Sequence, residues 1–184
     1  MRNQISILAL DLGKNLGWAR CTCIFRPELR IDVVHHGTEH LDVLATERMN
    51  REYNEVYDFN RFRMIVYEEV IRKLTSLVKF DSFVAEDVFC KYNQVSAFKS
   101  LVLYKEILEK VVNVEYQKRL YTIPPTLIKK HIAGYGHDDK TLVQQAVLNN
   151  PHISVKNPDK ATSHEFDAIA GCWAAIHEYL MIPV

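Results

Sequence analysis

The stretch ISILALDLGKNLGWARCTCIF, residues 5–25, constrains the fold more than any other part of this chain. An apolar run ends at Asp11, and a short polar turn then leads into a second apolar run. This pattern predicts a buried strand over 5–11 and an antiparallel partner over 17–25. Burial of a carboxylate costs free energy unless a partner compensates for it. Asp11 is therefore the first candidate for a functional residue.

Hydrophobic periodicity predicts further strands and helices along the rest of the chain. The stretch FRMIVYEEVIRKLTSLV carries apolar residues at helical spacing and belongs to a long predicted helix. Pro124 and Pro125 suit a helix start, Gly134 suits its end, and Ser163 is the expected N-cap of the last helix. We expect strands over 30–41, 82–89 and 119–124, helices over 46–79, 94–112, 124–134, 138–150 and 163–180, and a polar loop over 151–163.

The order of these elements, βββαβαβα with extra helix near the end, predicts an α/β fold with a mixed sheet. With 184 residues, 48% of them hydrophobic, the chain is expected to form a single domain over 1–184. Its 23 basic residues balance its 23 acidic residues, so net charge does not indicate nucleic-acid binding. A neutral total can still combine a basic face with an acidic pocket.

Two further features bear on the compartment in which the protein works. The N-terminal apolar run is too short for a signal peptide, and no segment approaches the roughly 20 apolar residues of a membrane span. We therefore expect a soluble protein of the cytoplasm, or of the host cytoplasm if the gene is viral. The cysteine spacing fits no zinc site, so Cys21, Cys23, Cys90 and Cys172 are expected to be buried, reduced thiols.

Carboxylates stand at the ends of several apolar elements. Asp11 ends the first strand, Glu86 lies near the end of strand 82–89, and Asp167 lies in the last helix, three residues after His164. If the first and fourth strands are neighbours, their carboxylates crowd together and need a cation. Oxygen ligands with an imidazole suit Mg²⁺ or Mn²⁺, and a pair of ions about 3.5–4 Å apart is widely used to cut phosphodiesters. Taken singly, each residue also fits a turn or a helix N-terminus.

The chain resembles the RuvC-type Holliday-junction resolvases of the ribonuclease-H-like superfamily. The resemblance runs through ILALDLGKNLGWA, VAEDVFCKYNQVSAFKSLVLYKEIL, IPPTLIKKHIAGYGHDDKTLV and SHEFDAIAGCWAAIHE. It implies a five-stranded mixed sheet, three antiparallel strands followed by two parallel ones, flanked by helices. It also implies that two Mg²⁺ ions, for which Mn²⁺ can substitute, are held by Asp11, Glu86, His164 and Asp167.

The same resemblance implies contacts with DNA. Phe89, three residues after Glu86, corresponds to an aromatic residue that meets DNA near the junction centre. A K…G-x-G-x-x-x-K segment aligns Lys129 and Lys140 with phosphate-binding lysines, and Lys130 adds positive charge. From the residues alone, Phe89 is equally well a core residue, and each lysine a solvated surface charge.

The resemblance implies a Mg²⁺-dependent endonuclease that nicks branched DNA, Holliday junctions first. Paired nicks need two active sites, so a C2 homodimer is expected, with helices 64–79 and 94–112 as its candidate interface. An insert over 42–64 and the neutral net charge depart from the family pattern. Nothing in the sequence identifies a helicase partner.

Three alternatives remain from the sequence. The same chemistry could act on flaps, forks or RNA in hybrids. The segment DLGKNLG also resembles a phosphate loop of actin-like ATPases, although 184 residues are too few for their two lobes and a second phosphate loop is absent. The chain could also be a non-catalytic nucleic-acid-binding relative, against which the complete carboxylate set argues.

Overall fold

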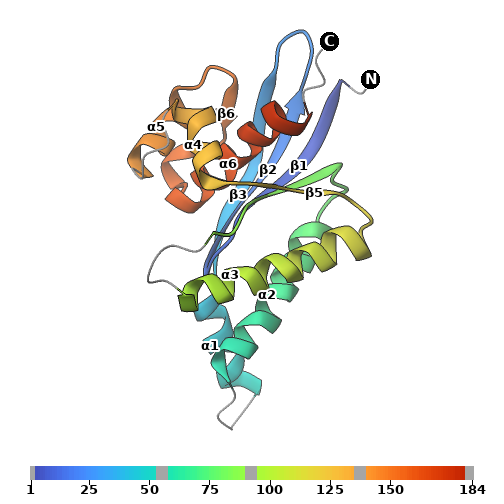
Figure 1. Cartoon of the computed structure of the whole chain (residues 1–184), viewed down its shortest axis with the longest axis vertical. Helices are drawn as coiled ribbons and strands as arrows, with labels where there is room; N and C mark the ends of the chain where they lie inside the picture. Colours follow the sequence, from blue (N-terminus) through green and yellow to red (C-terminus); the bar gives the residue numbers. More distant parts are fainter. Residues whose placement is uncertain (1–2, 53–57, 90–94, 135–139, 181–184) are drawn as a thin grey trace.

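The computed structural model describes residues 3–52, 58–89, 95–134 and 140–180. Within them lies one mixed sheet with the strand order β5-β4-β1-β2-β3-β6 (Figure 1). Strands β1, β2 and β3 form an antiparallel meander, while β4, β5 and β6 each pair in parallel. The strands are β1 Gln4–Asp11, β2 Asn15–Ile24, β3 Arg30–His40, β4 Ser82–Glu86, β5 Leu120–Ile123 and β6 Ile153–Val155.

The mixed α/β sheet is confirmed, but its predicted count of five strands is wrong. The sixth strand, β6, lies in the segment 151–163 that was expected to be a polar loop. With three residues, β6 is too short to show an alternating pattern in the sequence. It forms because Ile31–Val33 of β3 offers a strand edge, and the Ile31 N–H donates to the His152 carbonyl at 2.8 Å.

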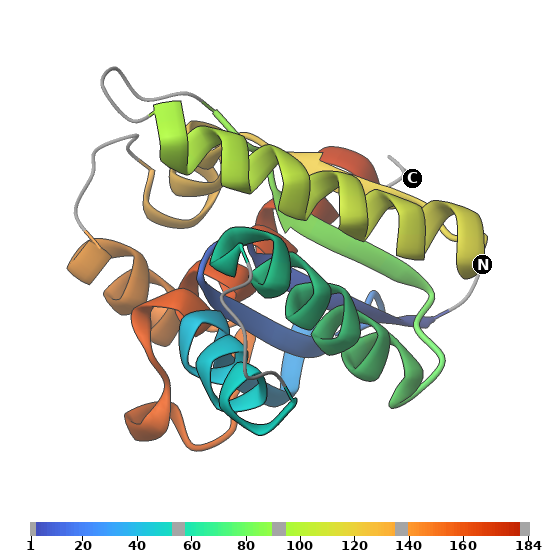
Figure 2. The same ribbon diagram turned by 90° about the horizontal axis from the view of Figure 1, so that it is seen from below.

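Two groups of helices cover the two faces of the sheet. In Figure 1, α4, α5 and α6 lie toward one side, while Figure 2 shows α1, α2 and α3 on the other. The helices are α1 Leu41–Glu52, α2 Phe59–Ser76, α3 Val95–Glu109, α4 Pro125–Ala133, α5 Lys140–Asn149 and α6 Ser163–Ala175, with π-helical η1 Lys110–Glu115 and η3 Ile176–Leu180 and the 3₁₀ turn η2 Pro158–Lys160.

The predicted helix over 46–79 is two helices. Asp58 caps the N-terminus of α2 by accepting hydrogen bonds from the Asn60 and Arg61 N–H groups. A residue that caps a helix start has non-helical dihedrals, so the cap separates α2 from α1. The predicted insert 42–64 therefore comprises most of α1 and the first turn of α2, and Arg63 joins them through an ion pair with Asp42 at 2.7 Å.

The ends of two other helices also bear on the predictions. Gly134 terminates α4 in the left-handed conformation, with φ 76° and its N–H donating to the Lys130 carbonyl, as expected. The N-cap of α6 is Thr162 rather than Ser163, which is the first helical residue. Cys21, Cys23 and Cys172 are buried free thiols as predicted, and Cys90 lies outside the described residues.

Alternation along the strands produces two hydrophobic cores, one on each face of the sheet, and a small third cluster of Ala45, Phe62 and Val66 lies between α1 and α2. In β1, Ile7 and Ala9 pack into the core beneath α4, α5 and α6. Leu8 and Leu10 pack into the core formed with α2 and α3. Successive side chains on a strand point to opposite faces, so Asp11 continues the row of Ile7 and Ala9 and faces α6.

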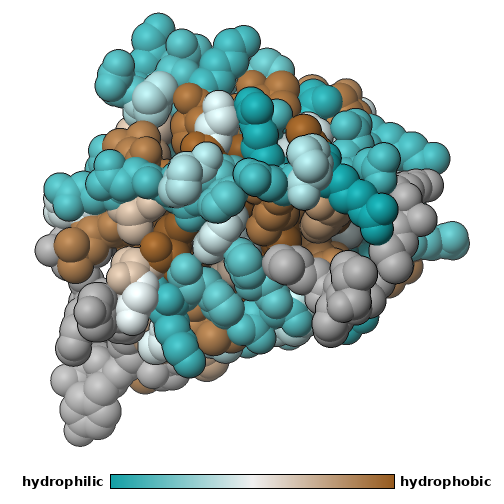
Figure 3. Space-filling model, turned by 90° about the horizontal axis from the view of Figure 1, so that it is seen from above, coloured by the Kyte–Doolittle hydropathy of each residue, from teal (hydrophilic) through white to brown (hydrophobic). Residues whose placement is uncertain are grey.

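Among the described residues, no helix is both long enough and apolar enough to cross a bilayer. At the end of the molecule that carries the β2–β3 turn, apolar side chains are interspersed with hydrophilic ones (Figure 3). Helices α2 and α3 also carry exposed apolar side chains, among them Ile65, Val95 and Leu103.

Candidate active site

Two neighbouring parallel strands bring the predicted carboxylates Asp11 and Glu86 to one end of the sheet. Leu10 of β1 pairs with Ala85 of β4, and each strand ends on the following carboxylate. Val84 lies in the core on the α6 side, so alternation places Glu86 on that same face, as it does Asp11. The sheet thus presents both acids to the first turn of α6.

Helix α6 supplies the other two predicted residues. The Nδ1 atom of His164 lies 2.7 Å from an Asp11 carboxylate oxygen. One potential ligand atom from each of Asp11, His164 and Asp167 lies within 4.8 Å of the others. Glu86 lies at the neighbouring strand end, outside this cluster of three. The structure therefore brings three of the four predicted ligands into one cluster and places the fourth beside it.

The donor set of this cluster fits a hard divalent cation. Two carboxylates and one imidazole are ligands that Mg²⁺ and Mn²⁺ accept. The side chains of Asp11 and His164 are 14% and 27% exposed, so they are shielded but open to solvent. Partial burial lowers the local dielectric and increases the repulsion between Asp11 and Asp167, which a cation would relieve.

Gly17 permits the close approach between the sheet and α6. The sequence analysis did not single out this glycine. It pairs with Asp11 across β1 and β2. A Cβ atom at Gly17 would lie 2.2 Å from the backbone oxygen of His164, which is far inside van der Waals contact. A glycine within a strand often marks a site where another backbone approaches closely, so the position of Gly17 in a predicted strand was a signal that could have identified it.

A buried carboxylate that the sequence analysis also missed anchors the same turn of α6. Glu165, 4% exposed, accepts hydrogen bonds from Thr38 at 2.9 Å and Thr162 at 3.1 Å, and it pairs with His36 Nδ1. Burial alone would raise the pKa of Glu165, but the hydrogen bonds from His36 and Thr38 hold it below its usual range. Glu165 thus ties α6 to β3.

A β-bulge aims the β3 side chains at Glu165. Across β2, Cys21 pairs with Val33 but Arg20 pairs with His35, so Val34 is an extra residue in β3. The bulge shifts the alternation by one residue, and His36 now lies opposite Ala19, whose side chain belongs to the α6-side core. Bulges frequently re-aim side chains beside active sites.

The predicted DNA-contacting residues are described in part. Phe89 is 45% exposed, so the alternative of a core residue does not hold. Lys129 and Lys130 lie in α4, partly exposed and exposed respectively. Lys140 is the first residue of α5, and its side chain, like the intervening 135–139, lies outside the described residues.

Comparison with known proteins identifies the family. The family model for the crossover junction endodeoxyribonuclease RuvC matches residues 28–173. The chain belongs to the RuvC family. The matched region contains Glu86, His164 and Asp167 and begins after Asp11, so the place of Asp11 in the site rests on geometry and on the resemblance of its motif. Family membership supports a junction-resolving endonuclease.

Solved structures of RuvC proteins share the fold. Thermus thermophilus RuvC has 15% sequence identity and a TM-score of 0.67, with 92% of each chain covered. The structure of T. thermophilus RuvC with a Holliday junction substrate gives 15% identity, a TM-score of 0.66 and the same 92% coverage of both chains. The yeast mitochondrial Holliday junction resolvase gives 13% identity and a TM-score of 0.61, covering 92% of this chain and 75% of that one. A search of curated proteins found no match.

Proposed function

We propose that this chain is a structure-selective endonuclease that resolves Holliday junctions and related branched DNA by hydrolysis of phosphodiester bonds. The observation that carries the proposal is the cluster of Asp11, His164 and Asp167 at the end of the central strand of a RuvC-family fold. Its relative from T. thermophilus was solved with a Holliday junction substrate, which supports branched DNA as the ligand of this chain.

The four residues Asp11, Glu86, His164 and Asp167 would hold two Mg²⁺ ions, which supply an activated water and stabilise the charge on the leaving 3′-oxygen. We infer that Asp11, placed between α6 and Glu86, is shared by both ions. The Asp11 carboxylate orients His164 by accepting from its Nδ1 atom. Nε2 then carries the free lone pair of the neutral ring, and His164 would use it either to ligate a metal ion or to move a proton at the attacking water.

We also propose a role for Phe89 and the α4 lysines in binding the junction. Phe89 follows Glu86 by three residues and exposes a large apolar ring beside the strand end that carries the site. An exposed aromatic can stack on an unpaired base at the branch point. Lys129, Lys130 and Lys140 are proposed to bind backbone phosphates, which would position the DNA without reading its sequence.

The test of the proposed function is cleavage of defined DNA structures. Four-way junctions, three-way junctions, flaps, linear duplex and RNA–DNA hybrids would be incubated with Mg²⁺, Mn²⁺ or EDTA and resolved on denaturing gels. We expect paired nicks in the four-way junction with either metal and none with EDTA. Preferential cutting of flaps or hybrids would reassign the substrate. Tight junction binding without any cleavage would indicate a non-catalytic relative.

A homodimer is the assembly that paired nicking requires, and we propose that it forms through α2 and α3. Ile65 and Leu103, each 46% exposed, and Val95, 57% exposed, leave apolar surface on these helices. Light scattering at micromolar concentration should give about twice the chain mass of 21.4 kDa. A monomer both alone and with junction DNA would contradict this assembly.

A further inference from the structure

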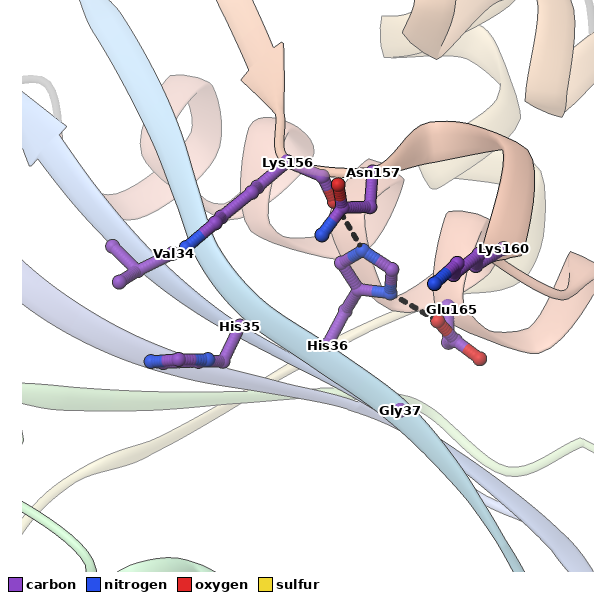
Figure 4. Close-up of a pocket in the computed structure, with 8 residues that line it drawn as sticks. All are labelled: Val34, His35, His36, Gly37, Lys156, Asn157, Lys160 and Glu165. Carbon is purple, nitrogen blue, oxygen red and sulfur yellow. Dashed lines mark hydrogen bonds and ion pairs between the residues drawn. The ribbon is translucent and has the colours of Figure 1, made fainter.

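A pocket lies beside the first turn of α6, the turn that also contributes His164 to the cluster of Asp11, His164 and Asp167. It has a volume of about 320 Å³ and lies between β3 and the connection from β6 to α6 (Figure 4). His35, His36 and Gly37 line it from β3, and Lys156, Asn157 and Lys160 from the connection. Because β6 pairs only with Ile31–Val33, the outer edge of β3 beyond Val33 has no strand partner in the described residues.

The lining of this pocket carries net positive charge. Lys156 and Lys160 are exposed, and within the described part of the chain neither forms an ion pair. The only carboxylate in the lining, Glu165, is paired with His36. The second ring nitrogen of His36, Nε2, lies 2.7 Å from the Lys156 carbonyl oxygen, so both ring nitrogens face acceptors. Two lysine ammonium groups therefore stand against one carboxylate in the lining, and that carboxylate is already paired with His36.

The segment that carries the lysines is held in place by its backbone. His36 binds the Lys156 carbonyl, as Figure 4 shows. Asn157 adopts the left-handed conformation at φ 54°, and its carbonyl accepts from the Lys160 N–H at 3.2 Å. These contacts fix the main chain that carries both lysines, so little main-chain entropy is lost when an anion binds in the pocket. In Figure 4 the Lys156 side chain extends past His36 toward Val34, and Lys160 lies on the Glu165 side of the pocket.

The first turn of α6 contributes one residue to the pocket and another to the cluster of Asp11, His164 and Asp167. His164 contacts Asp11, while its neighbour Glu165 faces β3 and lines the pocket. Side chains on different sides of a helix are separated by on the order of 10 Å. One DNA strand advances about 3.4 Å per nucleotide along the helix axis, and its phosphates are further apart in space because the strand winds around that axis, so this separation spans at most about three nucleotides.

We propose that this pocket binds a backbone phosphate of the DNA strand being cut, within about three nucleotides of the scissile phosphate. Lysine ammonium groups bind phosphate as point charges, and the Asn157 amide can add a hydrogen bond. The inference rests on the proposed function, because it requires DNA to bind at the cluster of Asp11, His164 and Asp167. It identifies Lys156, Asn157 and Lys160 as a DNA-binding site separate from the α4 lysines.

The first test compares salt dependence. Junction binding in EDTA would be measured by fluorescence anisotropy over a range of salt concentrations for the wild type, the double variant Lys156→Ala/Lys160→Ala and a Lys79→Ala control. Lys79 is exposed beyond the C-terminus of α2, at the end of the sheet where β4 begins. Loss of one phosphate contact should make the slope of log K against log salt shallower by about one in the double variant only.

The second test locates the phosphate. Junctions carrying one neutral methylphosphonate linkage at each position near the cut would be bound to the wild type and to the double variant. We expect one position, within about three nucleotides of the cut, where neutralisation weakens wild-type binding but leaves the double variant unaffected. Unchanged salt slope, or no such position, would overturn the proposal even if the wild type cleaves junctions.

Two controls separate this proposal from its alternatives. The first control adds inorganic phosphate and measures the melting temperature of the wild type and of the double variant. If phosphate raises only the wild-type value, and no methylphosphonate position affects the two proteins differently, the pocket binds free anions and the DNA assignment is overturned. If the wild type neither binds nor cuts any branched DNA, the proposed function itself fails. Thermal melting of the double variant establishes that it is folded, as expected for two exposed side chains.

Discussion

Asp11→Asn is expected to abolish DNA cleavage while leaving junction binding close to the wild-type level. The amide retains an oxygen that can accept from His164 Nδ1, which lies 2.7 Å from the native carboxylate, so the local geometry should persist. The negative charge that holds a divalent cation is lost. A loss of roughly 4 kcal/mol of transition-state stabilisation corresponds to about a thousandfold in rate, and we expect at least that decrease.

The effect of Mg²⁺ on the melting temperature tests metal binding by Asp11→Asn without relying on its cleavage activity. Mg²⁺ should raise the melting temperature of the wild type, because it binds the folded state, and should have little effect on Asp11→Asn. Asp32→Asn is the matched control, since Asp32 is also a strand aspartate but forms an ion pair with Arg30 near the start of β3. It should cleave like the wild type. Near-normal cleavage by Asp11→Asn would remove Asp11 from the set of ligands.

Gly17→Ala is expected to reduce both stability and cleavage. The added Cβ would lie 2.2 Å from the His164 backbone oxygen and 2.4 Å from its carbonyl carbon, so main chain must move. Overpacking of this kind costs about 1–3 kcal/mol, or roughly 3–10 °C in melting temperature for a domain of this size. Because α6 would be displaced from β2, His164 and Asp167 should separate from Asp11 and bind Mg²⁺ more weakly.

Gly171→Ala provides the control within the same helix. A Cβ there would have its nearest contact at 3.8 Å, with the Ile128 side chain, which is an ordinary packing distance. Replacing a helical glycine by alanine without a clash is neutral or slightly stabilising. We therefore expect Gly171→Ala to melt and cleave like the wild type. If Gly17→Ala did the same, the close approach of α6 to Gly17 would have no part in forming the site.

Local pattern was sufficient to predict the hairpin and the residues that carry the chemistry. The two apolar runs in residues 5–25, with the polar turn between them, predicted β1 and β2, because such a pattern is visible over a few residues. The spacing of three between His164 and Asp167 placed both on one face of a helix for a similarly local reason. The same short-range signals located Gly134 at the end of α4.

Features that depend on distant partners were not predictable in this way. The short strand β6 forms only because β3 presents an edge to it, and the break between α1 and α2 depends on a cap at Asp58 that the periodicity of 46–79 conceals. The anchoring of α6 by Glu165 required the bulge at Val34, which reverses the alternation that the sequence of β3 suggests. Each depends on backbone hydrogen bonds and burial supplied by another segment.

Local sequence pattern is enough to place Asp11 and Glu86 at the ends of β1 and β4 and His164 at the start of the last helix, because periodicity and capping act within a few residues. It is the three-dimensional packing that brings Asp11 and His164, 153 residues apart, to 2.7 Å and leaves Glu86 outside their cluster. That distance is set by how closely α6 packs on β2 at Gly17 and by its attachment to β3 through Glu165. Such packing is decided by atomic contacts across the whole core rather than by the residues of any one segment.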